Sequence, residues 1–232
     1  MSSSVVCVIL AGGLGTRLRS VVSDRPKCLA PVNGRPFLEL QLDALAELGV
    51  NRFVLSLGYM AQAVEKAVMP LRNKYALECV IESDPLGTGG AVLKAMVDLD
   101  LDEVLVTNGD TWLDAPLDAM LRQLDLSQGE LMRLAAVWVP DRGRYGGLTL
   151  RGEQVVGFVS KGANGPGPIN AGFYRLHRRA FAERESGDAF SLETTVLTQL
   201  VAQGALTATA VLGSFIDIGV PEDYRRFCES RG

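Results

Sequence analysis

The chain contains little of the chemistry that histidine and paired cysteines supply. His177 is the one histidine among 232 residues and lies in a basic stretch, where we expect a solvated side chain. A single histidine excludes histidine-based metal clusters and reactions that need two histidines. The cysteines are far apart, without CxxC or metal-ligand spacing. Lys27 could lower the pKa of the neighbouring Cys28, but all the cysteines are interpreted as structural. They are Cys7, Cys28, Cys79 and Cys228.

Long apolar runs and an excess of positive charge are also missing. The apolar start, residues 5–11, is too short to span a membrane and lacks the basic segment that opens a signal peptide. The net charge of −4 argues against a surface for nucleic acid. A chain of this length and composition can bury one sizeable core. We therefore expect a cytoplasmic globular protein with no nucleic-acid partner and no membrane partner.

Apolar runs alternate with helical patterns along the first half, which predicts a Rossmann-like α/β fold with a mostly parallel central sheet and helices on both faces. The second half is strand-rich and predicts a small lobe. A stretch rich in glycine and proline, 162–168, predicts a mobile loop bordering a site. Strands are expected at 5–10, 52–57, 77–81, 103–107, 131–139, 146–150, 155–159, 171–176 and 206–211, and helices at 37–48, 60–71, 89–97, 192–202 and 221–228.

A glycine-rich turn, residues 10–17, follows the first predicted strand directly. Glycines let a backbone approach a ligand closely, and their N–H groups can point together at an anion. Arg17 and Lys27 would add the positive charge that a polyphosphate needs. The spacing matches neither the dinucleotide fingerprint nor the P-loop, which argues against a dinucleotide-dependent oxidoreductase. The turn therefore indicates a nucleoside triphosphate site, and a tight structural turn is the alternative.

Two aspartates are candidates for holding a divalent cation. Asp110 comes directly after a predicted strand, at the sheet edge where ligands of such folds bind, although a turn or capping role is its alternative. Asp217 is a lone carboxylate in an apolar run, where an unpaired charge would be costly. Two aspartates together with phosphate oxygens make a typical Mg²⁺ environment. Of the five lysines, Lys27 and Lys161 lie in loops rich in proline or glycine, where a functional lysine is more plausible.

Several short motifs, in order along nearly the whole chain, resemble those of the sugar-1-phosphate nucleotidyltransferase family. Each motif alone is modest, and together they are specific. A finer similarity, in segments 144–146, 190–193 and 215–224, is to the members that transfer a guanylyl group to D-glycero-α-D-manno-heptose 1-phosphate. The family motifs are residues 10–18, 25–27, 30–32, 85–90, 108–110, 170–174 and 217–224.

The resemblance implies a role for each matching residue. Arg17, Lys27 and Asp110 would be catalytic, with Arg17 stabilising the departing pyrophosphate and Lys27 contacting the α-phosphate. Asp110 and Asp217 would hold Mg²⁺. Ser160 stands where the family often has glutamate, which leaves the neighbouring sugar contacts open. The nucleotide would be bound by Leu10, Ala11, Gly12, Gly13, Gly15, Thr16, Arg17, Lys27, Gly87 and Asp110, and the sugar phosphate by Gly109, Lys161, Asn170 and Glu193.

The implied reaction joins a nucleoside triphosphate, expected to be GTP, to a sugar 1-phosphate and releases pyrophosphate. The attacking phosphate oxygen is already anionic, so a strong general base is not needed, in keeping with the single histidine. A uridylyltransferase acting on an amino-sugar 1-phosphate is one alternative, and a nucleotide-sensing module without catalysis is another. We expect one domain over 1–232, with a nucleotide-binding half at about 1–115 and a sugar-binding half at about 116–232, and a homodimer is a further candidate.

Overall fold

The computed structural model describes residues 4–13, 18, 22 and 25–231. The chain divides into two compact units, each of which is described by itself. The first unit comprises Met1–Pro85, Thr107–Trp112 and Ile216–Gly232, and the second comprises Leu86–Val106 and Leu113–Phe215. The predicted α/β class with a mostly parallel central sheet is confirmed.

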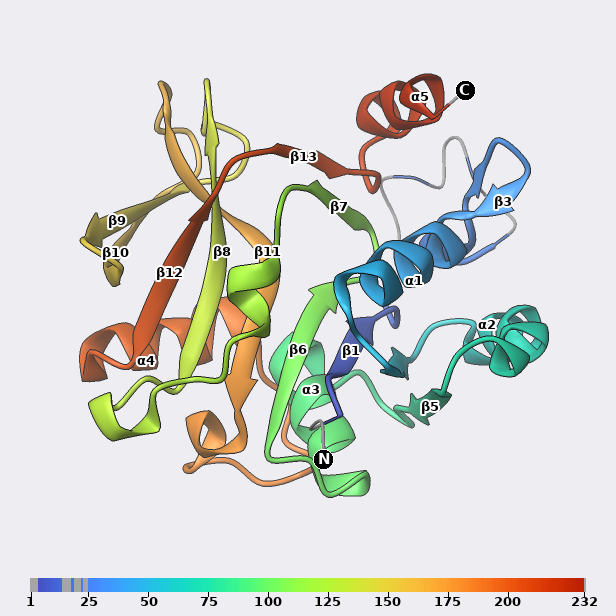
Figure 1. Ribbon diagram of the computed structural model, residues 1–232, viewed down its shortest axis with the longest axis horizontal. Helices are drawn as coiled ribbons and strands as arrows, with labels where there is room; N and C mark the ends of the chain where they lie inside the picture. The colour runs from blue at the N-terminus through green and yellow to red at the C-terminus, as the bar shows by residue number, and fades with distance from the viewer. Residues whose placement is uncertain (1–3, 14–17, 19–21, 23–24, 232) are drawn as a thin grey trace. The chain divides into compact units, whose positions relative to one another are not determined.

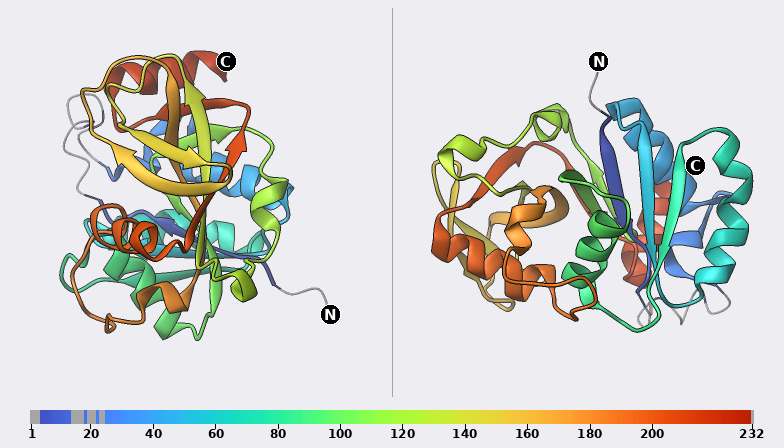
Figure 2. Two further views of the ribbon diagram at one scale, coloured as in Figure 1. Left: turned by 90° about the vertical axis from the view of Figure 1, so that its left-hand side faces the viewer. Right: turned by 90° about the horizontal axis from the view of Figure 1, so that it is seen from below.

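The first unit is built on three parallel strands in the order β5-β4-β1, which Figure 2 shows side by side. Helix α1 ends where Gly49 takes a left-handed conformation (φ 110°) and its N–H bonds back to Leu45 and Ala46. The elements, drawn in blue to teal and in red in Figure 1, are β1 (Val6–Leu10), β2 (Pro31–Val32), β3 (Arg35–Pro36), α1 (Phe37–Leu48), β4 (Arg52–Leu57), α2 (Ala61–Val68), β5 (Leu77–Ile81) and α5 (Pro221–Ser230).

In a separate apolar cluster of this unit, helix α5 packs against the segment that follows Lys27. The rings of Phe37, Trp112 and Phe227 lie 5.2–6.1 Å apart. The hydroxyl of Tyr224 on α5 donates a hydrogen bond to the carbonyl of Pro31. The buried members of the cluster are Leu18, Val22, Ala30, Val32, Phe37, Ile216, Ile218, Tyr224 and Phe227.

The second unit is a mixed sheet in the order β6-β11-β8-β12-β10-β9. Strand β8 runs parallel to β12 and antiparallel to β11, and these three long strands lie side by side in Figure 1. The elements are α3 (Gly87–Asp98), β6 (Glu103–Asn108), which continues into the first unit, β7 (Thr111–Asp114), β8 (Met132–Val139), β9 (Gly147–Arg151), β10 (Gln154–Val159), β11 (Gly167–His177), α4 (Leu197–Gln203), β12 (Leu206–Val211) and β13 (Ser214–Asp217).

Three predicted elements differ from the structure by more than two residues at one end. The predicted helix 60–71 stops at Val68 and continues as a 3₁₀ turn because Pro70 cannot donate an intrahelical hydrogen bond. The predicted helix 192–202 opens with a π-helical turn, Leu192–Val196. The predicted strand 171–176 begins earlier, at Gly167, so the end of the expected loop 162–168 is a strand, in which Pro168 pairs with Trp138 of β8.

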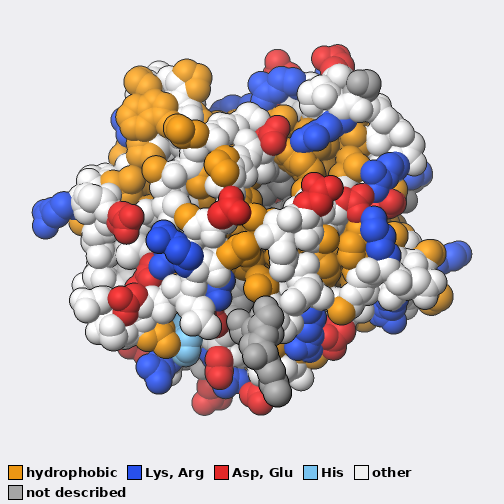
Figure 3. All heavy atoms as spheres, viewed as in Figure 1, with side chains coloured by type: hydrophobic (Ala, Val, Ile, Leu, Met, Phe, Trp, Pro, Cys, Tyr) orange, Lys and Arg blue, Asp and Glu red, His pale blue; other side chains and the backbone are white. Residues whose placement is uncertain are grey.

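Charged side chains of both signs are mixed over the face of the molecule that Figure 3 shows, without a large field of one sign. Within the described ranges, every helix is too short or too polar to cross a bilayer. A mixed acidic and basic surface fits the slight negative net charge of the chain.

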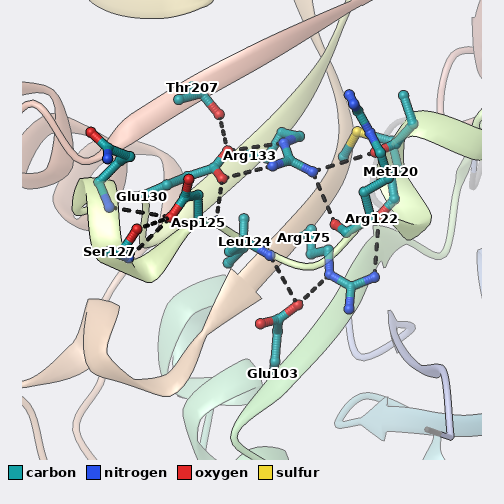
Figure 4. Close-up of polar contacts among 12 residues, drawn as sticks. Glu103, Met120, Arg122, Leu124, Asp125, Ser127, Glu130, Arg133, Arg175 and Thr207 are labelled. Carbon is teal, nitrogen blue, oxygen red and sulfur yellow. Dashed lines mark hydrogen bonds and ion pairs between the residues drawn. The ribbon is translucent and has the colours of Figure 1, made fainter.

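A network of ion pairs lies in the second unit, near the ends of β6, β8, β11 and β12 (Figure 4). Glu130, 7% exposed, accepts hydrogen bonds from Nη2 and Nε of Arg133, at 2.6 and 2.9 Å. The hydroxyl of Thr207 and the backbone N–H of Asp125 donate to the same carboxylate, at 2.5 and 2.8 Å. Burial alone would raise the pKa of Glu130, but these donors outweigh it and hold the pKa below its ordinary value.

We expect Glu130→Gln to lower the free energy of unfolding by about 2 kcal/mol at neutral pH, because Arg133 loses its buried anionic partner. Since the folded pKa is depressed, the contribution of the carboxylate is present above its ordinary value of 4.5 and is lost as the pH falls through the folded value. Urea unfolding between pH 7 and pH 3 measures this. Glu153→Gln, at an exposed position, is the control. If wild type and Glu130→Gln differed in free energy of unfolding by the same amount at both pH values, the role assigned to the ionised Glu130 would be wrong.

Candidate functional site

Three strand ends of the first unit converge around the glycine-rich turn. The backbone N–H of Gly109 donates to the carbonyl of Leu10 at 2.9 Å, and the N–H of Tyr59 donates to the carbonyl of Gly12 at 3.2 Å. A Cβ at Gly12 would come within 2.8 Å of the Gly58 nitrogen and 3.3 Å of Glu82 Oε1. Position 12 therefore needs glycine for close packing against the neighbouring strand, in addition to any contact with a ligand.

Lys27, Asp110 and Asp217 lie together in the first unit. The Nζ of Lys27 is 2.5 Å from Oδ2 of Asp110, and the two side chains are only 17% and 24% exposed. Gly219 lies among all three residues. A Cβ there would be 2.7 Å from Asp217 Oδ1, 2.9 Å from Lys27 Nζ and 3.2 Å from Asp110 Oδ2. Residues separated by about 190 positions in sequence thus form one cluster of a cation and two carboxylates, which we call the Lys27 cluster.

Separate elements of the first unit hold each member of the Lys27 cluster. Lys27 opens a 3₁₀ turn, Lys27–Leu29, directly after Pro26. Asp110 lies between β6 and β7, and its carbonyl accepts the N–H of Ile218 at 2.9 Å. Asp217 ends β13, and its Oδ1 accepts the N–H of Gly219 at 2.9 Å. The backbones that carry the two carboxylates are therefore hydrogen-bonded to one another.

Gln41 supports this arrangement and could not be identified from the sequence. It lies on α1 and is 5% exposed. Its amide nitrogen donates to the carbonyls of Asn108 and Thr111, at 2.9 and 3.1 Å, on either side of Asp110. Its amide oxygen is buried without a hydrogen-bond partner among the described residues. Gln41 thus clamps the turn that carries Asp110, and its helical position gave no signal of this role.

The two carboxylates of the Lys27 cluster fit a hard divalent cation that also binds substrate phosphates. In the part of the chain that the structure describes, no group of three or more His, Cys, Asp or Glu side chains could hold a metal. Magnesium in phosphate-transferring proteins is commonly bound by one or two carboxylates, with phosphate oxygens and waters completing the shell. Two aspartates beside a lysine suit such a shared site and do not suit an all-protein cage.

Of the predicted residues of the second unit, Glu193 lies in another polar group, with Thr88 and Ser191. The hydroxyl of Thr88 donates to Oε2 of Glu193 at 2.6 Å and accepts the N–H of Leu192 at 2.9 Å. The hydroxyl of Ser191 donates to the same Oε2 at 3.0 Å. Gly87 has a positive φ of 70°, and a Cβ there would lie 2.6 Å from the carbonyl of Phe190. The turn at Gly87 is therefore packed directly on the segment that carries Glu193.

Asn170 closes a bulge in β11. The pairing of β11 with β8 shifts register between Asn170 and Tyr174. The side chain of Asn170 accepts the N–H of Gly172 at 3.0 Å and donates to the hydroxyl of Tyr174 at 2.8 Å. Burial and the negative charge of Glu193 raise the pKa of Tyr174, so its phenol is neutral across the physiological range. Much of the hydrogen-bonding capacity of Asn170 is therefore used within the strand.

Lys161 is exposed in a loop that is tied to the loop before β9. The N–H groups of Gly143 and Gly165 both donate to Oδ1 of Asp141, at 3.0 and 3.1 Å, and the N–H of Gly162 donates to the carbonyl of Gly143 at 2.8 Å. These bonds link the two loops at several points. Within its own unit, Lys161 is thus presented from a braced loop, and its side chain is accessible.

Other sequence-based expectations have mixed outcomes. Leu14, Gly15, Thr16 and Arg17 lie outside the described residues. The interpretation of Cys28 as structural fits its burial, which raises the pKa of the thiol to about 12 and outweighs the lowering effect of the neighbouring Lys27. The expectation of a solvated His177 is wrong, since the side chain is partly buried, its Nδ1 accepts the N–H of Arg179 at 3.1 Å, and burial lowers its pKa.

Comparisons with known proteins identify the family of this chain. The model of the nucleotidyl transferase family matches residues 6–230. The chain is 35% identical to a D-glycero-alpha-D-manno-heptose 1-phosphate guanylyltransferase of Aneurinibacillus thermoaerophilus, over 94% of this chain and 95% of the relative. A relative of the same description from Campylobacter jejuni is also 35% identical, over 95% of this chain and 97% of the relative.

Solved structures give the same result. The crystal structure of HddC from Yersinia pseudotuberculosis superposes with a TM-score of 0.85 at 35% identity, covering 98% of this chain and all of that one. Its complex with GMP-PN superposes with a TM-score of 0.84 at 36% identity, with the same coverage. With the family model spanning nearly the whole sequence, the chain belongs to the nucleotidyl transferase family.

Proposed function

We propose that this protein transfers the guanylyl group of GTP to a sugar 1-phosphate, D-glycero-α-D-manno-heptose 1-phosphate, giving GDP-heptose and pyrophosphate. The observation that carries the proposal is the Lys27 cluster, in a chain whose full-length relatives are heptose 1-phosphate guanylyltransferases. The complex of HddC with GMP-PN supports a guanine nucleotide as the donor.

In the proposed reaction, a phosphate oxygen of the sugar 1-phosphate attacks the α-phosphorus of GTP. The new phosphorus–oxygen bond forms as the bond to the β-phosphate breaks, and pyrophosphate leaves with the electron pair. Both reactants are anions, so positive charge has to reduce their repulsion and stabilise the crowded phosphorus. An ammonium has three donors, and Asp110 uses one of those of Lys27, which leaves others for the α-phosphate.

The remaining first-unit residues are proposed to bind the triphosphate and the metal ion. Members of this family typically use a divalent metal, which we propose to be Mg²⁺ held by Asp110 and Asp217. When bound, such an ion neutralises charge on the phosphates. The backbone of Leu10, Ala11, Gly12 and Gly13 would line the triphosphate site, and Gly15, Thr16 and Arg17 are proposed to complete it.

The second-unit residues are proposed to select the substrates. Gly87 would face the base. Thr88 and Ser191 hold Oε2 of Glu193 in place, and this carboxylate would accept hydrogen bonds from sugar hydroxyls. Lys161 would pair with the phosphate of the sugar, and Asn170 would contact the sugar phosphate, as would Gly109 of the first unit. Holding both substrates in one orientation would supply much of the rate acceleration. A cytoplasmic location, a homodimer and the single-domain organisation with halves at about 1–115 and 116–232 stay predictions.

A pyrophosphate-release screen tests the proposal. GTP, ATP, UTP and CTP are each combined with heptose, mannose, glucose and N-acetylamino-sugar 1-phosphates in the presence of Mg²⁺. The expected result is fastest release with GTP and heptose 1-phosphate, and none when either substrate is omitted. Fastest release with UTP and an amino-sugar 1-phosphate would replace the proposed substrates. Tight nucleotide binding without turnover anywhere in the panel would instead indicate a sensing module.

Gly219→Ala is expected to lower kcat by about 10-fold or more, because the added methyl group would displace Lys27 and Asp217 from their places. The conflicting atoms are the ends of side chains, so the fold can adapt and the midpoint of thermal unfolding is expected to change little. Gly157→Ala, where a Cβ makes only ordinary contacts of 3.8 Å, is the control. Unchanged turnover by Gly219→Ala would show that the spacing within the Lys27 cluster is unimportant.

A further inference from the structure

Thr88 joins two proposed binding elements of the second unit. It follows Gly87, which is proposed to face the base, and its side chain bonds to Glu193, which is proposed to bind the sugar. The hydroxyl is used in both directions, donating to Oε2 of Glu193 at 2.6 Å and accepting the N–H of Leu192 at 2.9 Å. These two bonds fix the position of the hydroxyl hydrogen and leave the threonine little freedom.

Close backbone packing supports this link. The N–H groups of Gly89 and Gly90 both donate to the carbonyl of Phe190, at 3.0 and 3.3 Å. A Cβ at Gly90 would lie 2.2 Å from the carbonyl of Asp188, and one at Gly89 would lie 2.4 Å from the Phe190 ring. The start of α3 and the segment 188–192 therefore touch along their backbones, and Thr88 adds the one side-chain bond from this turn to a carboxylate.

The hydrogen bonds of Glu193 are unequal between its two oxygens. Oε2 accepts from both Thr88 and Ser191, whereas Oε1 accepts no hydrogen bond from any described residue. The side chain is only partly buried, and Oε1 is not sealed from solvent. A carboxylate with one oxygen anchored by protein donors presents the other in a fixed direction, which suits an acceptor for a ligand hydroxyl.

We propose that Thr88 is a positioning residue that orients Glu193 toward a hydroxyl of the sugar 1-phosphate. This rests on the proposed function and adds to it the residue that sets the direction of the sugar-binding carboxylate. Thr88 acts through Glu193 and need not touch the sugar itself. A hydrogen bond to a charged group is worth enough that its loss weakens sugar binding by about 10-fold.

The test compares Thr88→Val, which keeps the shape and removes the hydroxyl, with Thr88→Ser, which keeps the hydroxyl. Thr88→Val is expected to raise KM for the sugar 1-phosphate about 10-fold, while its KM for GTP stays within about 2-fold of wild type. Thr88→Ser is expected to have a KM for the sugar 1-phosphate close to that of wild type. Thr194→Val makes the same substitution at an exposed threonine beside Glu193 and is expected to resemble wild type. A rise in KM for GTP alone would overturn the proposal.

A double-mutant cycle separates positioning from simple support of the fold. If Thr88 acts through the carboxylate, Thr88→Val has little added effect in a Glu193→Gln background. Additive effects on KM for the sugar 1-phosphate would overturn the proposal. Calorimetric titration of each folded variant with the sugar 1-phosphate gives the same comparison without turnover. An inactive wild type would contradict the proposed function, whereas an active wild type with an unaffected Thr88→Val variant would contradict only the role of Thr88.

Discussion

Lys27→Ala is expected to lower kcat for guanylyl transfer by about 100-fold or more, the effect typical of losing a charged group that stabilises a transition state. Its Nζ lies 2.5 Å from Asp110, and a Cβ at Gly219 would come within 2.9 Å of it. A cation in this place can serve the α-phosphate only if it is held there before the substrates arrive. Initial rates of pyrophosphate release at saturating GTP and sugar 1-phosphate measure the effect.

Lys66→Ala is the matched control, because Lys66 is an exposed lysine of the same unit, on α2. It is expected to turn over at the wild-type rate. Binding of GTP by Lys27→Ala should fall much less than kcat, since the backbone of the glycine-rich turn is unchanged. A rate for Lys27→Ala within about 3-fold of the control would contradict a transition-state role for this lysine.

Asp110→Asn is expected to lower kcat by about 100-fold and to raise the Mg²⁺ concentration needed for half-maximal activity. The substitution preserves the size of the side chain and the backbone hydrogen bond from Ile218, so the fold is expected to remain. It removes one of two carboxylates from the Lys27 cluster and leaves Lys27 without its anionic partner. Titration of pyrophosphate release with Mg²⁺ measures both effects.

Asp118→Asn removes the same charge at an exposed position and is the control for Asp110→Asn. The Mg²⁺ dependence of this control is expected to match that of wild type. If Asp110→Asn lost activity with an unchanged Mg²⁺ dependence, Asp110 would serve the reaction by holding Lys27, and its proposed part in binding the metal would be wrong.

Much of the fold could be predicted because its signals are local. Strands β4, β5 and β12 and helix α1 have the predicted bounds, since each combines a clear apolar pattern with a terminating residue such as Gly49. The short strand β7 was missed, and β13 was recognised only as an apolar run, because four residues carry too little periodicity. The early start of β11 was missed because glycine and proline indicate loops, and only the pairing with β8 shows a strand there.

Some residues of the candidate site could likewise be predicted from the sequence, and others could not. Lys27, Asp110 and Asp217 stand in motifs that resemble those of one family, and Asp110 follows a predicted strand, so their meeting within the first unit could be anticipated. Gln41 and Thr88 could not be assigned, because their contacts depend on backbone carbonyls and carboxylates that are distant in sequence. For Gly12, the sequence pattern indicates ligand contact, and the structure adds that neighbouring backbone leaves no room for a side chain.

Transfer of isotopic label from GTP tests the central claim most directly. The protein is incubated with Mg²⁺, heptose 1-phosphate and GTP labelled with ³²P at either the α- or the γ-phosphate. The account predicts that the α-label appears in the sugar nucleotide and that the γ-label appears in pyrophosphate. Transfer of the γ-label to the sugar, or retention of both labels in GTP with every sugar 1-phosphate in the panel, would contradict it.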